Sequence, residues 1–504
     1  MLLGAPLAPW LLLLPVRAGD QPQWGQAWSR NMVSAERGLP DSFDLTSGRH
    51  VRWRAPLGTE SHSTPIVANG RVYIGTNNGE PRDPRHQGDR GVMLCLDERD
   101  GHLLWQLVVP KREEDPFHDW PRTGMSSPVT VEGDRVYLVN NRGEVMCLDA
   151  KGLADGNDGP FREEGRHMSP RGTNAPAEPM QPGPLDADVL WMTDLTREAG
   201  IWSHDGAHSS ILIRGDHLYL NSGTGVDNTH KKIRTPDAPS LLVLDKKTGR
   251  ILARDDEHIA PDIFHCTWSS PSLGQVDTLP VIFLAAGNGV VHAFPLLAAS
   301  PRSAGEVERM KSVWRFDLDP AAPKTEVHRY NTNRREGPSN IYGMPLYDEA
   351  GRRVFVAGGG DLFWGKNEAW LKCIRATGRG DVTPRALAWS YPLEKHVLST
   401  PVLHQGMIFI ADCGRKVHCV DAATGQGIWT HDIRGEVWAT PLIADGKMYL
   451  GTRAGEFLIF AASREKQLLF SADVGAPISA TATAANRVLY VATMKEIVAL
   501  DARK

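Results

Sequence analysis

The chain has 504 residues, of which 41% are hydrophobic and 23% charged, with a formal net charge of -4. This balance lacks the basic surplus that binds nucleic acid or anionic membrane surfaces, so we expect neither as a partner. No stretch approaches the roughly 20 apolar residues that a membrane-spanning helix requires, so no transmembrane segment is expected. The 49 Gly and 35 Pro residues are typical of a chain that turns often and folds as one large domain.

Residues 1–18 are predicted to be a signal peptide. A short apolar run at residues 11–14 precedes Val16-Arg17-Ala18, which fits a small-residue cleavage site, although a basic n-region is missing. We therefore predict a periplasmic or secreted protein. Residues 19–48 precede the first repeat and are interpreted as an N-terminal extension.

From residue 49 to the C-terminus, one design of about 40 residues recurs. Each copy starts with Ser/Thr-Pro or an equivalent and continues through three β-runs separated by Gly-containing turns, the last ending near Leu-Asp-Ala. A fourth run, such as Gly425–Trp429, leads to the next copy. Repeats of this period are typical of four-stranded antiparallel β-propeller blades, because one blade alone cannot bury both of its faces.

The start of a copy can be found eight times, which predicts eight blades. The starts are at Ser63, Ser126, Ser209, Ser269, Gly343, Ser399, Ala439 and Ser479. The last copy stops at Leu500-Asp501-Ala502 and lacks its outer strand, which residues 50–53 would supply. We therefore predict that the N-terminal strand closes the final blade and removes two open sheet edges.

Tryptophan and cysteine recur in register with the copies. Outer strands carry Trp53, Trp105, Trp191, Trp314, Trp389 and Trp429, with Phe470 at the same place in the seventh copy. Such a ring is expected to cover the turn of the neighbouring blade. Four cysteines stand in the third strands of different blades, too far apart for bridging, and are interpreted as small buried residues: Cys95, Cys147, Cys373 and Cys419.

Two segments depart from the repeat. Residues 152–187 are rich in Pro, Gly and charge and show no apolar period, so we predict a surface insertion between the third and outer strands of the second blade. A second insertion covers residues 331–340 and the run Gly358–Gly365. That run lacks the Lys-Ser/Thr ending of a phosphate loop and is interpreted as a permissive turn, with Phe363 and Trp364 available to a partner.

The loops that lead into the innermost strands converge on the mouth of the central channel, where we expect function. Their imidazoles could ligate a transition metal or act as bases, and their aromatic rings could stack on a ligand. The alternative is that these residues have no ligand: the polar groups are at the channel mouth because it is hydrated, and the aromatic rings pack against neighbouring inner strands. The candidate ligand-binding residues are His62, His118, His204, His208, His265, Trp268, Tyr342 and Trp438. No catalytic signature is present, so no catalytic residue is assigned and the metal remains open.

The spacing from Cys419-Val420-Asp421 through Gly425 to Trp429 resembles the tryptophan-docking motif of the pyrroloquinoline-quinone (PQQ) repeat. The resemblance covers residues 49–504. It implies a propeller like that of the quinoprotein alcohol dehydrogenases, in a superfamily that also contains non-catalytic members such as the outer-membrane assembly lipoprotein BamB. For a dehydrogenase it implies a quinone over a Trp, a disulfide between adjacent cysteines, and Ca²⁺ held by carboxylate and Asn ligands, but this chain has no adjacent cysteines.

The predicted fold is therefore an all-β, eight-bladed propeller closed by an N-terminal strand. The leading functional hypothesis is a monomeric scaffold that binds a protein partner or a small ligand at a propeller face, with envelope or outer-membrane assembly as one such role. The alternative is a quinone- or metal-dependent oxidoreductase that uses the His- and Trp-rich channel mouth. No cofactor is assigned; PQQ with Ca²⁺ or a transition metal belongs to the alternative and has no motif support.

Overall fold

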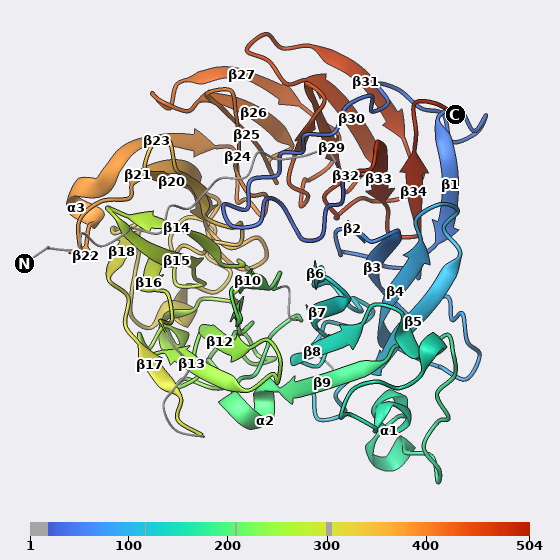
Figure 1. Ribbon diagram of the computed structural model, residues 1–504. Helices are drawn as coiled ribbons and strands as arrows, with labels where there is room; N and C mark the ends of the chain where they lie inside the picture. Colours follow the sequence, from blue (N-terminus) through green and yellow to red (C-terminus); the bar gives the residue numbers. More distant parts are fainter. Residues whose placement is uncertain (1–18, 116, 207–208, 299–304) are drawn as a thin grey trace, which may run out of the picture.

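The computed structural model describes residues 19–115, 117–206, 209–298 and 305–504, so the predicted signal peptide lies outside the described residues. Eight separate sheets surround a central axis, which confirms the predicted eight-bladed propeller (Figure 1). Within the described ranges, no helix combines the length and the apolar character needed to cross a bilayer.

The first four blades follow the chain in order from the innermost strand outward. The first contains β2 (Ile66–Ala68), β3 (Arg71–Asn77), β4 (Arg90–Asp97) and β5 (Leu103–Pro110). The second contains β6 (Thr130–Glu132), β7 (Arg135–Val139), β8 (Glu144–Asp149) and β9 (Val189–Asp194). The third contains β10 (Leu212–Arg214), β11 (His217–Asn221), β12 (Leu241–Asp245) and β13 (Ile251–Asp255). The fourth contains β14 (Ser272–Val276), β15 (Leu279–Ala285), β16 (Val290–Pro295) and β18 (Trp314–Asp317).

The remaining blades repeat this order, except that the last is completed from the other end of the chain. The fifth contains β19 (Leu346–Asp348), β20 (Arg353–Gly359), β21 (Ala369–Arg375) and β23 (Leu387–Leu393). The sixth contains β24 (Val402–His404), β25 (Met407–Asp412), β26 (Lys416–Asp421) and β27 (Gly427–Asp432). The seventh contains β28 (Leu442–Ala444), β29 (Lys447–Gly451), β30 (Glu456–Ala461) and β31 (Leu468–Asp473). The eighth contains β32 (Thr483–Ala485), β33 (Val488–Ala492), β34 (Glu496–Leu500) and β1 (Val51–Pro56).

Strand β1 pairs antiparallel with β34, with Val51 opposite Leu500 and Trp53 opposite Ala499, so the predicted closure is confirmed. Two blades differ from the expected four strands. Strand β17 (Glu308–Met310) pairs parallel with β13, and β22 (Gly380–Asp381) pairs parallel with β18. Both belong to the connection before the next blade's outer strand, and each covers part of an otherwise open sheet edge.

The outer-strand tryptophans dock on the next blade as predicted. The indole Nε1 of Trp53 donates to the carbonyl of Glu98, and that of Trp105 to the carbonyl of Ala150. The ring lies so close to the neighbouring turn that a Cβ added to Gly101 would be 2.6 Å from Trp53. Glycine is therefore required there for space as well as for its φ of +77°.

All six cysteines are buried and free, as the repeat register predicts for four of them. Each of those four faces a fourth-strand tryptophan across the sheet; for example, Cys95 is opposite Trp105 and Cys419 opposite Trp429. A small side chain at this position leaves room for the indole on the same face.

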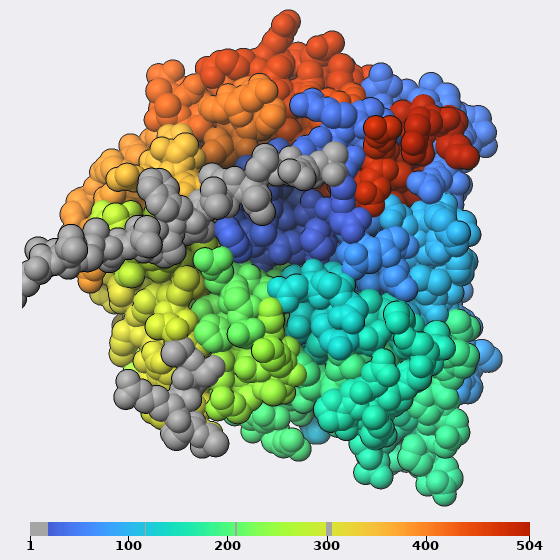
Figure 2. Space-filling model, viewed as in Figure 1, coloured from blue at the N-terminus to red at the C-terminus, as the bar shows by residue number. Residues whose placement is uncertain are grey.

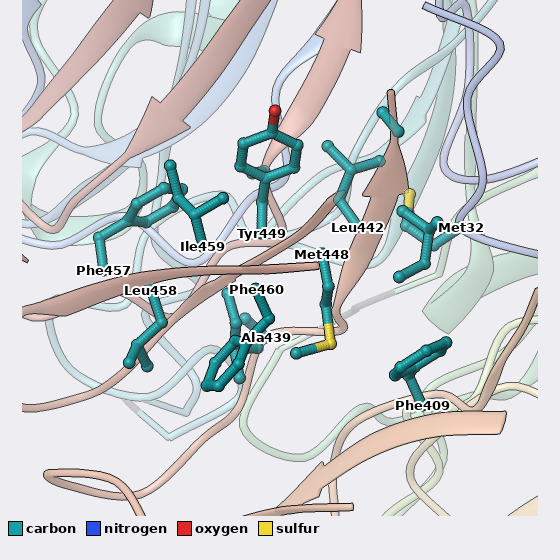
Figure 3. Close-up of a cluster of buried hydrophobic side chains, with 14 of the residues drawn as sticks. Met32, Phe409, Ala439, Leu442, Met448, Tyr449, Phe457, Leu458, Ile459 and Phe460 are labelled. Carbon is teal, nitrogen blue, oxygen red and sulfur yellow. The ribbon is translucent and has the colours of Figure 1, made fainter. Parts of the chain in front are cut away.

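Close packing of inner strands between blades forms the core. Figure 3 shows Phe457, Leu458, Ile459 and Phe460 of β30 beside Met448 and Tyr449 of β29. Met32 from the N-terminal extension belongs to the same cluster. The extension is therefore part of the core of the propeller.

Residues 19–48 run along the innermost strands from blade to blade. Bridges join Gln21 to Val67 and Val33 to Ile443. The guanidinium of Arg30 is fully buried and donates to the backbone carbonyls of Ser210 and Pro271. Dark-blue atoms of this segment fill the centre of the face turned to the viewer (Figure 2). One end of the central channel is therefore closed by the chain itself.

The insertion at residues 152–187 contains regular structure that its composition did not predict. Helix α1 (Glu164–Met168) packs against β5, and His167 Nε2 lies 2.7 Å from the Glu144 carboxylate in a buried hydrogen bond. Two single-turn 3₁₀ helices flank it, η1 (Gly152–Asp155) and η2 (Gly172–Asn174). The helix is only five residues long, so its sequence contains no apolar periodicity from which it could have been predicted.

Other helices of the described residues are short and lie in connections. They are α2 (Leu195–Ala199), α3 (Thr383–Ala386), η3 (Ala260–Asp262) and η4 (Val327–Tyr330). The side chain of Asp194 accepts hydrogen bonds from the backbone N–H groups of Thr196 and Arg197 and caps α2.

Candidate functional site

A cavity of about 430 Å³ lies at the mouth of the central channel, on the side of the loops that lead into the innermost strands. All eight blades contribute to its wall, so the cavity lies on the propeller axis. The lining residues are Glu60, His62, Trp120, Thr123, Asp205, His230, Trp268, Tyr342, Phe363, Trp364, Leu398, Trp438, Arg453 and Ser479.

Aromatic rings form much of this wall. Trp268 and Tyr342 have ring centroids 4.8 Å apart, and His62 stacks on Trp438 at 5.9 Å. The guanidinium of Arg453 lies over the Trp438 ring, 4.5 Å from its centroid. The cavity therefore presents flat apolar surfaces with a few polar groups between them.

Three imidazoles meet at one side of the cavity. His204, His230 and His265 each offer a ring nitrogen, and these nitrogens lie within 4.8 Å of one another. His204 Nε2 is 3.1 Å from His230 Nε2. The carboxylate of Asp205 is 3.4 Å from His204 Nε2 through Oδ1 and 3.5 Å from His265 Nε2 through Oδ2. Three imidazole nitrogens thus point toward one small volume, and the Asp205 carboxylate lies beside two of them.

These four side chains come from three separate loops. His204 and Asp205 precede β10, His230 lies between β11 and β12, and His265 precedes β14. Asp205 and His230 both adopt a left-handed backbone, with φ of 58° and 57°. Non-glycine residues in this conformation are uncommon and cluster at functional sites, where the surrounding structure holds them.

A turn fixes the position of His230. Its backbone N–H donates to the carbonyl of Asp227, and its own carbonyl accepts a hydrogen bond from Asn331 Nδ2. The neighbouring Asn228 donates to the buried carboxylate of Asp115, which also accepts from Arg234. Side chains from the second, third and fifth blades therefore anchor the loop that carries this imidazole.

A second layer orients His265. Its Nδ1 lies 3.0 Å from Asp361 Oδ2, and the Tyr342 hydroxyl donates to the same oxygen. The other oxygen of Asp361 accepts from the backbone N–H groups of Phe363 and Trp364. This pairing holds the proton of His265 on Nδ1 and leaves Nε2 directed toward Asp205, where it makes no aligned hydrogen bond within the described residues.

The pKa values of the three imidazoles are shifted in different directions. Burial lowers the pKa of His204 to about 4 and also lowers the pKa of His230. Burial disfavours charge on His265 as well, but its neighbours, among them the Asp361 carboxylate, raise its pKa well above the usual value. Burial raises the pKa of Asp361, yet the adjacent His265 outweighs it and lowers the pKa to about 2. Without a bound ion, His204 and His230 are thus neutral near pH 7.

The structure brings together most of the sequence-predicted residues. Four of them line the cavity: His62, Trp268, Tyr342 and Trp438. His204 and His265 are buried behind the cavity wall, in the imidazole cluster. His118 is not part of this wall: its buried ring packs edge-on against Trp202 at 5.3 Å, and burial lowers its pKa to about 3. His208 lies outside the described residues.

Sequence reasoning missed His230 and Asp361. His230 lies in residues 222–240, a long connection between β11 and β12, whereas residues 413–415 suffice between β25 and β26. That difference in length was the available signal. Asp361 ends the Gly358–Gly360 run interpreted as a permissive turn. A Cβ at Gly359 would lie 2.2 Å from the carbonyl oxygen of Glu368, so the run serves close backbone approach beside the site.

The fold defines the chain as an eight-bladed propeller with a cavity on its axis. A family model described as outer membrane protein assembly factor BamB, PQQ_2, matches residues 32–152 and 311–504. This match covers more than half of the sequence, and the chain belongs to this family of PQQ-like propellers. All three clustered histidines lie between the two matched ranges.

Comparisons with individual proteins give shorter or more distant matches. The chain is 30% identical over 101 residues to a quinohemoprotein alcohol dehydrogenase of Comamonas testosteroni, a match spanning 18% of this chain and 14% of that protein. Among solved structures, BamB from Moraxella catarrhalis aligns with a TM-score of 0.48 and 11% identity, covering 89% of this chain and 96% of the other. A europium-containing methanol dehydrogenase aligns with a TM-score of 0.49 and 11% identity, covering 94% of this chain and 89% of the other.

Proposed function

We propose that the protein is a binding scaffold that takes a small ligand into the cavity at the mouth of its central channel. The observation that carries this proposal is the cavity of about 430 Å³ on the propeller axis. All eight blades contribute to its wall, which combines aromatic rings with a few polar groups. Concave, largely apolar pockets with a few well-placed polar groups are the usual form of small-molecule sites.

The lining defines the class of ligand. Trp268, Tyr342 and Trp438 offer faces on which a flat or ring-shaped group can stack. Arg453 supplies a cation, and Glu60 and Asp205 supply acceptors for hydroxyl or N–H groups. The ligand best suited to this wall has a ring with an apolar face and polar substituents at its edge.

PQQ fits this wall poorly. It is a quinone with three carboxylates, which require several cationic partners when they are removed from water. Among the described lining residues, Arg453 is the one Lys or Arg side chain, and the carboxylates of Glu60 and Asp205 share the cavity. The donor set is instead rich in imidazole. We therefore assign no quinone chemistry to these residues.

A fluorescent probe tests the ligand site. We expect 1-anilinonaphthalene-8-sulfonate, a flat molecule with one anionic group, to bind the folded protein with one equivalent per chain. Trp438→Ala removes a stacking surface and the ring beneath Arg453, so the affinity should fall at least about fivefold, equivalent to about 1 kcal/mol of lost stacking. The measurement is a fluorescence titration at constant ionic strength.

The matched control is Leu468→Ala, which removes an exposed apolar side chain from the outer strand β31. Its titration should match that of the unaltered protein. Equal binding by Trp438→Ala, or loss of binding in the Leu468 variant, would place the probe elsewhere and contradict the proposal. Displacement of the bound probe by sugars, aromatic amines and quinones then ranks natural ligand classes.

A second candidate function is docking of a protein partner on the same mouth. Trp120 and Phe363 border the cavity and are 45% and 42% exposed, unlike most large apolar side chains of the described chain. Exposed aromatic rings are enriched at protein interfaces. The family description names an outer-membrane assembly factor, and an envelope role of this kind is the corresponding proposal. Trp120→Ala with unchanged partner recovery from envelope extracts would contradict it.

The proposed location is the periplasm or the exterior of the cell. The apolar run before Ala18 supports export, and so does the family's description as an outer-membrane assembly factor. Cell fractionation with mass analysis of the N-terminus tests this proposal. A protein retained in the cytosol with residues 1–18 attached would be evidence against it.

A further inference from the structure

The ring nitrogens of His204, His230 and His265 lie within 4.8 Å of one another, as those of a metal site do, and the Asp205 carboxylate lies beside two of these rings. In a tetrahedral zinc site with bonds of about 2.0–2.1 Å, two ligand atoms lie about 3.3–3.4 Å apart. The corresponding distances here are 3.1 Å between the Nε2 atoms of His204 and His230, and 3.4 and 3.5 Å from the Asp205 oxygens to His204 and His265. The remaining separations among the three ring nitrogens are at most 4.8 Å, so binding one ion requires side-chain shifts that shorten the longer ones.

The atoms behind the cluster supply the support that such a site requires. Metal-binding histidines usually donate their other ring N–H to a carboxylate or carbonyl, which fixes the tautomer and the ring orientation. His265 Nδ1 has this partner in Asp361, a fully buried carboxylate that is itself held by Tyr342 and two backbone N–H groups. The buried His265 Nε2 is thereby aimed at the cluster.

We propose that His204, His230, His265 and Asp205 bind one divalent transition-metal ion of the zinc class. Imidazole nitrogen with a carboxylate oxygen is a ligand set that suits such ions, and hard ions such as Ca²⁺ prefer oxygen alone. His230 and Asp205 also line the cavity, so the ion would lie in the cavity wall.

This inference deepens the proposed function. The action of the metal on a ligand rests on that function, whereas the metal site itself does not. The two can fail separately: a protein that binds zinc but not the fluorescent probe keeps the site and loses the ligand proposal. A protein that binds the probe but not zinc keeps the ligand proposal and loses the metal site.

The direct test is titration of the full chain with Zn²⁺ after treatment with a chelator. We expect one equivalent to bind in isothermal titration calorimetry. His230→Ala removes the half-buried ligand from the cavity wall, and its affinity should fall more than about 100-fold. Co²⁺ in place of Zn²⁺ should give the intense visible absorption of a tetrahedral site, and this band should disappear in the variant.

Asp361→Asn tests the positioning role of the second layer. The amide cannot accept the His265 proton as a carboxylate does, so Zn²⁺ affinity should fall about 10- to 100-fold. The Co²⁺ absorption should persist with a shifted maximum, because the four ligands remain. A merely structural residue would change the melting temperature without moving this band.

Two control variants separate this site from other histidines. His62→Ala removes an imidazole that lines the cavity without joining the cluster. His102→Ala disrupts Asp97, Asp100 and His102, a second group with ligand spacing that is mostly exposed. Both should bind one equivalent with unchanged affinity.

The competing interpretation is a protonated His265 held between Asp205 and Asp361 with no role for metal. It is supported, and the proposal overturned, if the folded wild-type chain binds no stoichiometric Zn²⁺. The proposal also fails if His230→Ala binds normally or His102→Ala loses the ion. Should circular dichroism show that His230→Ala does not fold, His230→Gln replaces it with a side chain of similar reach, and the same outcomes apply.

Discussion

Single residues that recur in most copies join neighbouring blades. In the described chain, the indole N–H groups of Trp53, Trp105, Trp191, Trp389 and Trp429 each donate to a carbonyl in the turn of the next blade. Opposite several of these rings stands a cysteine, which provides the space that the indole fills. Because one ring contacts two blades, its loss affects packing on both sides.

Trp429→Ala should lower the free energy of unfolding by about 3–5 kcal/mol, the usual cost of deleting a buried indole. Trp429 is 9% exposed, and its ring stacks on Phe460 of the next blade at 5.8 Å between centroids. The comparison variant is Trp120→Ala, whose ring is largely exposed. Urea unfolding followed by circular dichroism measures both, and equal stabilities would contradict the docking role.

Buried neutral histidines act at the same scale. His292 lies inside the fourth blade, where burial, reinforced by nearby Arg315, lowers its pKa to about 3. The unfolded chain has the ordinary value near 6.5, so between these values the unfolded state binds more protons. The stability associated with this residue is complete above pH 6.5 and is lost as the pH falls toward 3.

His292→Leu should therefore flatten the acid side of the stability profile. At pH 5 the protonation of unfolded His292 costs about 2 kcal/mol relative to pH 7, and the variant lacks this loss. Denaturant unfolding at pH 5 and pH 7 measures the difference. His258→Ala, which removes an exposed imidazole, is the control and should show the unaltered pH dependence. A His292 variant with the wild-type profile would be inconsistent with a buried neutral ring.

At the level of elements, closure depends on one strand. β1 completes the last blade by pairing with β34, and Arg54 in β1 also forms a bidentate ion pair with Glu496. Without β1, β34 would present an unpaired edge, and Trp53 would no longer cover the first blade. The same strand therefore joins the two ends of the chain and the first and last blades.

Deletion of residues 49–54 should lower the melting temperature much more than deletion of six residues from a surface connection. Residues 173–178, all exposed within the insertion, provide that control. Differential scanning calorimetry measures both variants, with dynamic light scattering to detect association through the exposed edge. An unchanged melting temperature in the first variant would contradict closure by β1.

For the whole molecule, the two ends of the channel differ. The N-terminal extension closes one end, with Arg30 buried among carbonyl oxygens of the inner strands. The other end carries the aromatic cavity and the imidazole cluster. Within the described residues, loops of the eight blades form the wall of that cavity, and the extension contributes no residue to it.

Much of the architecture could be predicted because the repeat is local. Each blade is encoded within about 40 residues, so the strand runs, the fourth-strand tryptophans and the missing outer strand of the last copy can be recognised along the chain. The parallel strands β17 and β22 could not, because short connecting segments have no pattern of their own. Helix α1 was missed for the same reason.

The sequence by itself determined the blade number, the closing strand and the burial of the repeated tryptophans and cysteines, since these follow from periodicity. It also indicated the channel mouth as the place for function, with His204, His265, Trp268, Tyr342 and Trp438 among its candidates. Only the tertiary structure decided which of these meet. It added His230 and Asp361 to them and separated His118, because loops from different blades approach one another only when the propeller closes around its axis.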